Sequence, residues 1–278
     1  MSAPLLTVED LNVSFPGRSG MTRAVRNAGF TLGHERLGIV GESGSGKSTT
    51  GRALLGLIPQ PGIVTAKRLE FGGQNLLACT ESDWQRLRGR RLSMVMQDPK
   101  YSLNPVQTVR EQIGETCRLH LGSNRKDADR RALAMLEAVK IRNPELVLHL
   151  YPHQLSGGMG QRVMIAMMLV AEPDVLIADE PTSALDVTVQ NEVLRILDDL
   201  VRERGMGLIF ISHNLTVVSS FCDRVLIMYG GKIVEECAAK DLHNARHPYT
   251  RALIAAAPSL DQPRAELATV TRDPEWLT

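Results

Sequence analysis

A glycine-rich stretch that follows a short apolar run constrains the fold more than any other feature of the chain. Residues 41–48 read GESGSGKS and come directly after RLGIV, a run typical of a buried strand. The stretch STTGRALLGLI then predicts a helix over 48–58. Glycines let the backbone N–H groups of such a loop surround phosphate groups, and the next helix directs its positive end toward them. The order strand, loop, helix therefore predicts a phosphate-binding loop.

The expected roles within this loop follow from the GxxxxGK[ST] pattern. Lys47 is expected to reach the outer phosphates of a nucleotide, and Ser48 to ligate Mg²⁺. A glycine- and serine-rich turn without a ligand is the alternative, and the strand before and the helix after argue against it. The predicted nucleotide-binding residues are Gly41, Glu42, Ser43, Gly44, Ser45, Gly46, Lys47, Ser48 and Thr49.

A second motif, VLIADEP at 175–181, supplies the carboxylates that a nucleotide triphosphatase needs. Four apolar residues lead to Asp179 at the end of a predicted strand. We expect Asp179 to hold the metal and Glu180 to polarise the attacking water. Taken alone, the motif could be a solvated strand end, but together with the loop it indicates nucleotide hydrolysis.

Composition excludes several other classes of protein. The 278 residues carry a formal net charge of +1, so no general attraction to nucleic acid or anionic lipid is expected. The four cysteines lack the spacing of a zinc site or a disulfide framework, which favours a reducing cytoplasm. The longest apolar stretch, at 163–171, is far shorter than the roughly 20 residues that span a bilayer, so the chain is not expected to cross a membrane.

Three further motifs are present: LSGGMGQR at 155–162 lies between the first two motifs, and SALD at 183–186 and LIFISHN at 208–214 come after them. Together, and in this order, the motifs resemble those of the ATPase subunit of ABC transporters. The resemblance covers nearly the whole chain. The resemblance implies that two subunits enclose two ATP molecules. The phosphate loop of one subunit would face residues of the other subunit, namely Ser156, Gly157, Gly158 and Asp186. Small residues at a helix start do offer bare N–H groups to a phosphate. For Ser156, an ordinary helix N-cap is the alternative.

The resemblance also implies roles for three residues outside these motifs. Gln97 matches the glutamine that lies between metal, water and helical lobe, and His213 matches the histidine that contacts the γ-phosphate. With Glu180 they form the expected catalytic group, and Mg²⁺ would be held by Ser48, Gln97 and Asp179. Phe15 is the nearest match to an adenine-stacking residue, but it could equally be a core residue.

The fold implied by the resemblance is α/β. It has a P-loop NTPase (RecA-like) core, an N-terminal antiparallel β subdomain and an inserted α-helical subdomain. Alternating strand and helix patterns after 158, and apolar residues spaced three and four apart before it, agree with this. We expect the ABC nucleotide-binding core at 1–98 and 159–240, and the helical subdomain, ending in the signature, at 99–158. A C-terminal helix and weakly ordered polar tail are expected at 241–278.

Two positions depart from the family pattern. Gly160 replaces a larger polar or basic residue of the signature, and a glycine within a helix costs about 1 kcal/mol relative to alanine. His34-Glu35 replaces the usual Gly-Glu before the strand that precedes the phosphate loop. Neither change removes a phosphate-contacting group, so we expect effects on rate or stability and retained ATP binding.

Three stretches resemble one importer subfamily, which takes up dipeptides, oligopeptides, nickel and related small solutes, including opines. These stretches are QDPKYSLNPVQTVREQI, EPTSALDVTVQ and HPYT at 247–250. This implies a peripheral location on the cytoplasmic face of the inner membrane. The implied partners are two permeases, a second ABC ATPase (a paralogue or a second copy) and, indirectly, an extracytoplasmic solute-binding protein. Many relatives carry a cysteine cluster after HPYT, but here no cysteine follows Cys237, so no iron-sulfur cluster is expected.

Other functions remain to be weighed. An ABC-type ATPase of a soluble assembly, such as a carbon-phosphorus lyase complex, would share the loop and signature, and SLNPVQTVREQI favours transport over it. A nucleic-acid machine would need a long coiled coil, zinc modules or a basic face, and the sequence indicates none. A regulatory module without hydrolysis is disfavoured by the presence of Glu180, Gln97 and His213.

Overall fold

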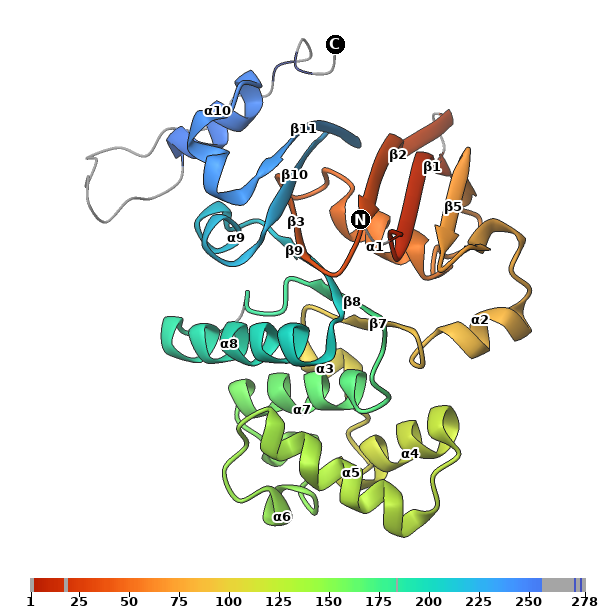
Figure 1. Cartoon of the computed structure of the whole chain (residues 1–278), viewed down its shortest axis with the longest axis vertical. Helices are drawn as coiled ribbons and strands as arrows, with labels where there is room; N and C mark the ends of the chain where they lie inside the picture. Colours follow the sequence, from red (N-terminus) through yellow and green to blue (C-terminus); the bar gives the residue numbers. More distant parts are fainter. Residues whose placement is uncertain (1–2, 18–19, 184, 257–272, 274–275, 277–278) are drawn as a thin grey trace. The chain divides into compact units, whose positions relative to one another are not determined.

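Strands and helices alternate over residues 157–229, and the rest of the described chain adds further strands and helices (Figure 1), which confirms the predicted α/β class. The residues that the computed structural model describes are 3–17, 20–183, 185–256, 273 and 276. They form two compact units: the first combines the chain up to Cys79 with the chain from Ile209 onward, and the second covers Thr80–Leu208.

The described elements are these. The strands are β1 (Leu6–Gly17), β2 (Gly20–Leu32), β3 (Arg36–Val40), β4 (Ile63–Thr65), β5 (Arg68–Phe71), β6 (Gln74–Asn75), β7 (Leu92–Val95), β8 (Val175–Asp179), β9 (Gly207–Ser212), β10 (Arg224–Tyr229) and β11 (Lys232–Ala238). The α-helices are α1 (Lys47–Leu54), α2 (Glu81–Leu87), α3 (Pro99–Ser102), α4 (Val109–Leu121), α5 (Arg125–Ala138), α6 (Pro144–Val147), α7 (Gly157–Leu169), α8 (Val187–Arg204), α9 (Leu215–Phe221) and α10 (Pro248–Ala256). Short 3-10 helices are η1 (Leu76–Ala78), η2 (Pro152–Gln154) and η3 (Ala239–Asn244).

An antiparallel sheet forms the amino-terminal part of the first unit, as predicted. Strand β1 pairs with β2, β4 and β5, and β6 continues the sheet beyond β5. Alternate residues of β1, among them Leu6, Val8, Leu11 and Val13, are buried. The alternation slips at Asp10, which has a φ of 53° where the β1–β2 register shifts. This bulge keeps apolar side chains of both halves of the strand on the buried face.

The remaining strands of the first unit run in the order β11-β10-β3-β9, with β10 parallel to β3 and antiparallel to β11. Strand β9 is buried along its whole length, as expected for a strand covered on both faces. At the start of β3, Arg224 donates hydrogen bonds to Glu35, with Nη2–Oε1 at 2.8 Å. The His34-Glu35 departure therefore retains the carboxylate that joins this turn to β10.

The second unit combines the parallel pair β7/β8 with a group of packed helices. Helices α4, α5 and α7 contact one another (Figure 1). Arg110 of α4 forms an ion pair with Asp129 of α5, and the guanidinium lowers the pKa of that carboxyl group. Helices α3 to α6 lie within the predicted helical subdomain; its boundaries at 99 and 158 stay predictions.

The carboxy-terminal helix is present as α10, and the rest of the predicted tail (257–272, 274–275 and 277–278) lies outside the described residues. Within the described part of the chain, no helix is long and apolar enough to cross a bilayer.

The same part holds no cluster of three or more His, Cys, Asp or Glu suited to a metal ion. Burial raises the pKa of the Cys222 thiol to about 12, so this cysteine stays protonated.

Candidate nucleotide-binding site

The phosphate loop leaves β3 after Val40 and enters α1 at Lys47, as the sequence predicts. Its backbone requires glycine at Gly46, which has a φ of 102°. A Cβ at this position would come within 2.5 Å of the carbonyl oxygen of Ala24. Helix α1 is shorter than the predicted 48–58, because Gly56 adopts a left-handed conformation with a φ of 61° just after it ends.

The side chain of Lys47 folds over the loop. Its Nζ donates to the carbonyl oxygens of Gly41 and Glu42, both at 2.8 Å, and the residue is only 5% exposed. The hydroxyl of Ser45 is buried and has no hydrogen-bond partner among the described residues, while the carbonyl of Ser45 accepts from Gly231 N at 3.1 Å. A lysine, an unpaired hydroxyl and a helix start fit an anionic phosphate chain.

Oxygen ligands that suit Mg²⁺ are present in both units. Ser48 is half-buried in the first turn of α1, in the first unit. Asp179 ends β8 in the second unit and is only 4% exposed. A hydroxyl and a carboxylate are hard oxygen ligands of the kind that Mg²⁺ prefers, so each of the two residues, taken by itself, suits this metal.

The other predicted residues of the first unit lie at the ends of strands. His213 directly follows β9 and is exposed, and Asn214 beside it caps α9 by accepting from Val217 N. Phe15 is half-buried near the end of β1, opposite Thr22 of β2. Adenine stacking by Phe15 stays a prediction.

Glu180 and Gln97 lie together in the second unit. Gln97 Nε2 donates to Glu180 Oε2 at 3.0 Å, although the two residues are 83 positions apart. Glu180 has a φ of 49°, a left-handed conformation that costs a non-glycine residue about 1–3 kcal/mol and is concentrated at functional sites. Ser183, which the sequence reading did not assign, donates its hydroxyl to the Glu180 carbonyl at 3.2 Å and accepts from Gln97 at 3.4 Å.

The signature motif begins helix α7. Ser156 is the N-cap and its Oγ accepts from Met159 N at 3.3 Å, so the capping interpretation is confirmed, and it is compatible with the predicted ATP contact. A Cβ on Gly158 would come within 2.8 Å of Val189 Cγ1, so glycine permits the close approach of α7 and α8. Among the described residues, a Cβ on Gly160 would meet Pro99 alone, at an ordinary 3.6 Å, so lack of space does not explain this glycine.

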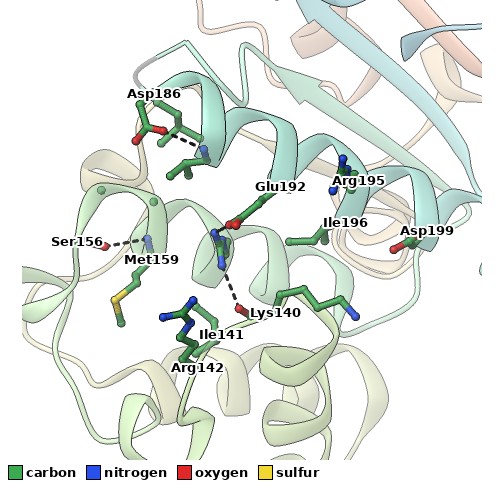
Figure 2. A pocket seen from close by; sticks show the side chains of 15 residues that line it. Lys140, Ile141, Arg142, Ser156, Met159, Asp186, Glu192, Arg195, Ile196 and Asp199 are labelled. Atoms are coloured by element: carbon green, nitrogen blue, oxygen red, sulfur yellow. Dashed lines mark hydrogen bonds and ion pairs between the residues drawn. The ribbon is translucent and has the colours of Figure 1, made fainter. Parts of the chain in front are cut away.

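A cavity of about 800 Å³ opens beside the signature (Figure 2). It brings Ser156, Gly157 and Gly158 together with Asp186, which caps α8 by accepting from Val189 N at 3.0 Å. Arg162 donates to the carbonyl of Lys140 at 3.0 Å and pairs with Glu192. The charged residues that line the cavity are Lys140, Arg142, Arg162, Asp186, Glu192, Arg195 and Asp199. No role was predicted from the sequence for the basic members: Arg162 ends the signature motif, and the other three lie outside the motifs.

The sequence profile of the ABC transporter family matches residues 25–183. The chain is 44% identical to the dipeptide transport ATP-binding protein DppD of Escherichia coli K12 over 268 residues, which cover 96% of this chain and 82% of that protein. It is 45% identical to the oligopeptide transport ATP-binding protein OppD of Salmonella typhimurium LT2 over 272 residues, covering 97% and 81%. The chain therefore belongs to the ABC transporter family, as one of its ATP-binding and ATP-hydrolysing subunits.

Solved structures confirm the fold of this class. CbiO1 of Clostridium perfringens, part of the ABC transporter complex CbiONQ, matches with a TM-score of 0.74 and 26% identity over 91% of this chain and 96% of that one. The dimeric cassette MJ0796 bound to ADP and Pi also has a TM-score of 0.74, over 84% and 98% of the two chains. At 24% identity, the second likeness concerns the fold alone.

Proposed function

We propose that this chain energises an importer of peptides or related small solutes, with nickel and opines in the same solute range. The observation that carries the proposal is its 44% and 45% identity, over nearly all its length, to ATP-binding proteins of dipeptide and oligopeptide transport. The HPYT stretch at 247–250 supports the same subfamily.

The proposed mechanism assigns the phosphate chain of ATP to the loop of residues 41–49. Lys47 moves from its two carbonyl acceptors toward the β- and γ-phosphates when the nucleotide binds, because an anion competes for its charge. Ser48, Gln97 and Asp179 would hold Mg²⁺, which would supply charge neutralisation on the phosphates. Phosphoryl transfer depends mainly on positioning and electrostatic stabilisation, which these fixed groups provide.

Glu180 is proposed to polarise the attacking water. Gln97 holds its carboxylate from one side, and the short turn containing Ser183 holds its backbone. The left-handed backbone at Glu180 supports this role, because such conformations persist where the surrounding structure fixes a functional side chain. His213 is proposed to contact the γ-phosphate.

A second ABC ATPase would complete each site. In this proposal Ser156, Gly157, Gly158 and Asp186 face the ATP held by the phosphate loop of the other subunit. The first turn of α7 supports it: Ser156 and Gly157 are exposed, and a Cβ on Gly157 would meet no atom within 4 Å among the described residues. A helix start of this kind can present N–H groups to a phosphate.

The remaining partners follow from the importer proposal. The chain would act at the cytoplasmic face of the inner membrane, bound to two permease subunits and served indirectly by an extracytoplasmic solute-binding protein. No nucleic-acid partner and no iron-sulfur cluster form part of the proposal. ATP would close the dimer of ATPases and move the permeases through the helical lobe at about 99–155, and Glu180-assisted hydrolysis would reopen the dimer.

Co-purification tests this function directly. We expect a tagged copy of the chain, released from membranes with a mild detergent, to retain two permeases and a second ABC ATPase, identified by mass spectrometry. A tagged Lys47→Ala variant is the matched control and should retain the same subunits, because the proposal assigns the permease contact to the helical lobe and not to this loop. Recovery of a soluble enzyme assembly without membrane proteins would contradict the importer proposal and leave the ATPase assignment intact.

A further inference from the structure

The carboxy-terminal helix α10 places one tyrosine against the phosphate loop. Tyr249 is the second residue of α10 and is 0% exposed. Its ring packs against Tyr229 of β10, with centroids 4.4 Å apart, and against Trp276 at 5.5 Å. These contacts explain why the ring is buried, but they do not account for the position of its hydroxyl.

That hydroxyl accepts a hydrogen bond from the backbone N–H of Glu42, with N–Oη at 3.0 Å. The N–H belongs to the peptide group between Gly41 and Glu42, and the carbonyl of the same group accepts from Lys47 Nζ at 2.8 Å. One peptide plane of the loop therefore lies between Tyr249 and Lys47. Hydrogen bonds on opposite sides of one peptide group polarise it and strengthen each other.

The segment that leads into α10 is itself anchored. The carboxylate of Glu235 in β11 accepts from the backbone N–H groups of Arg246 at 2.6 Å and His247 at 3.3 Å. His247 Nδ1 accepts in turn from Tyr249 N at 3.2 Å. The start of the helix, and with it the tyrosine hydroxyl, is thus held by a chain of hydrogen bonds from β11.

We propose that Tyr249 is a positioning residue for ATP binding, which sets the peptide plane between Gly41 and Glu42 and thereby the starting position of the Lys47 ammonium group. The inference rests on the proposed role of the 41–49 loop. It assigns the HPYT stretch a physical function: the stretch supplies an acceptor for the Glu42 amide of the loop. The ligand affected is the triphosphate of the nucleotide.

Tyr249→Phe tests this, because it keeps the ring and removes only the hydroxyl. We expect Kd and KM for Mg-ATP to rise about two- to tenfold, the range set by one hydrogen bond, while kcat and the melting temperature change little. Amide exchange across 42–48, followed by mass spectrometry without nucleotide, should become faster because the Glu42 N–H loses its acceptor. This second readout does not depend on activity.

The matched control is Tyr229→Phe, which removes a hydroxyl from the same aromatic cluster. That hydroxyl donates to the Asp273 carbonyl at 3.2 Å and not to the loop, so ATP affinity and loop exchange should equal those of the wild type. Equal ATP affinity and equal amide exchange in the wild type and Tyr249→Phe would overturn the inference. Equal losses of ATP affinity and of exchange protection in Tyr249→Phe and Tyr229→Phe would overturn it as well. If Lys47→Ala loses ATP binding while Tyr249→Phe keeps it, only this inference fails; unchanged binding in Lys47→Ala would refute the loop assignment on which it rests.

Discussion

Glu180 combines a strained backbone with a proposed catalytic role. A glutamate in a left-handed conformation is uncommon, and here its carboxylate is held by Gln97 and its carbonyl by Ser183. The chain offers a useful comparison in Glu172, which has a similar φ of 57° but is exposed and pairs with Arg204 at 3.8 Å. Backbone strain is therefore shared by both residues, and the surroundings of the carboxylate distinguish them.

At the residue scale, we predict that Glu180→Gln lowers ATP turnover by about two to four orders of magnitude, the usual contribution of a general base. ATP binding should persist, because the loop residues are unchanged, and the ATP-bound dimer should accumulate. Steady-state phosphate release and light scattering with Mg-ATP measure the two effects. Glu172→Gln is the control and should hydrolyse ATP at the wild-type rate. Normal turnover in Glu180→Gln would show that another group aligns the water.

Among the elements, helices α7 and α4 both begin with a hydroxyl side chain as N-cap. Ser156 caps α7, and Thr108 caps α4 with a reciprocal contact from Glu111, whose Oε2 accepts from Thr108 N at 2.7 Å. Hydrogen bonds to Thr108 lower the pKa of the Glu111 carboxyl group. Both caps contribute stability, but only the start of α7 lies in the cavity next to Asp186.

Replacing each cap by alanine separates stability from catalysis. Ser156→Ala and Thr108→Ala should each lower the free energy of unfolding by about 1 kcal/mol, the usual value of such a cap. Only Ser156→Ala is expected to lower ATP turnover, by about ten- to a hundredfold, since a lost hydrogen bond to a charged phosphate costs about 1.5–3 kcal/mol. Urea unfolding and phosphate release measure the pair. Equal loss of turnover in both variants would indicate that Ser156 only caps its helix.

For the whole molecule, ligand binding should appear as stability. At a Mg-ATP concentration of about 100 times Kd, the folded state gains about 2.7 kcal/mol, which raises the melting temperature by several degrees in a chain of this size. Lys47→Ala should lose most of this shift because it removes the charge facing the phosphates. Lys126→Ala, which removes an exposed lysine of α5, should keep it. Differential scanning fluorimetry measures the melting temperatures, with every variant made in a Glu180→Gln chain so that ATP is not hydrolysed during the scan. An unchanged shift in melting temperature in Lys47→Ala would contradict the loop assignment.

The long, regular elements were predicted correctly from the sequence, whereas the short ones were predicted less well. Strands β3, β8, β9 and β10 carry continuous apolar runs, which are visible without a structure. The two- to four-residue strands β4, β5 and β6 lie where prolines and glycines interrupt the pattern, and so few residues cannot display an alternation. Strand β11 was not predicted either, because its residues are mostly half-buried and mix apolar with acidic side chains.

The sequence by itself determined the chemistry that depends on neighbouring residues: the glycine conformations of the loop, the caps at Ser156 and Asp186, and the carboxylate at the end of β8. These arise from local sterics and hydrogen bonds within a few positions. The tertiary structure decided the pairs that join distant positions, Gln97 with Glu180 across 83 residues and Tyr249 with Glu42 across 207. Such contacts depend on how strands and helices pack, because packing alone brings groups so far apart in sequence within 3 Å.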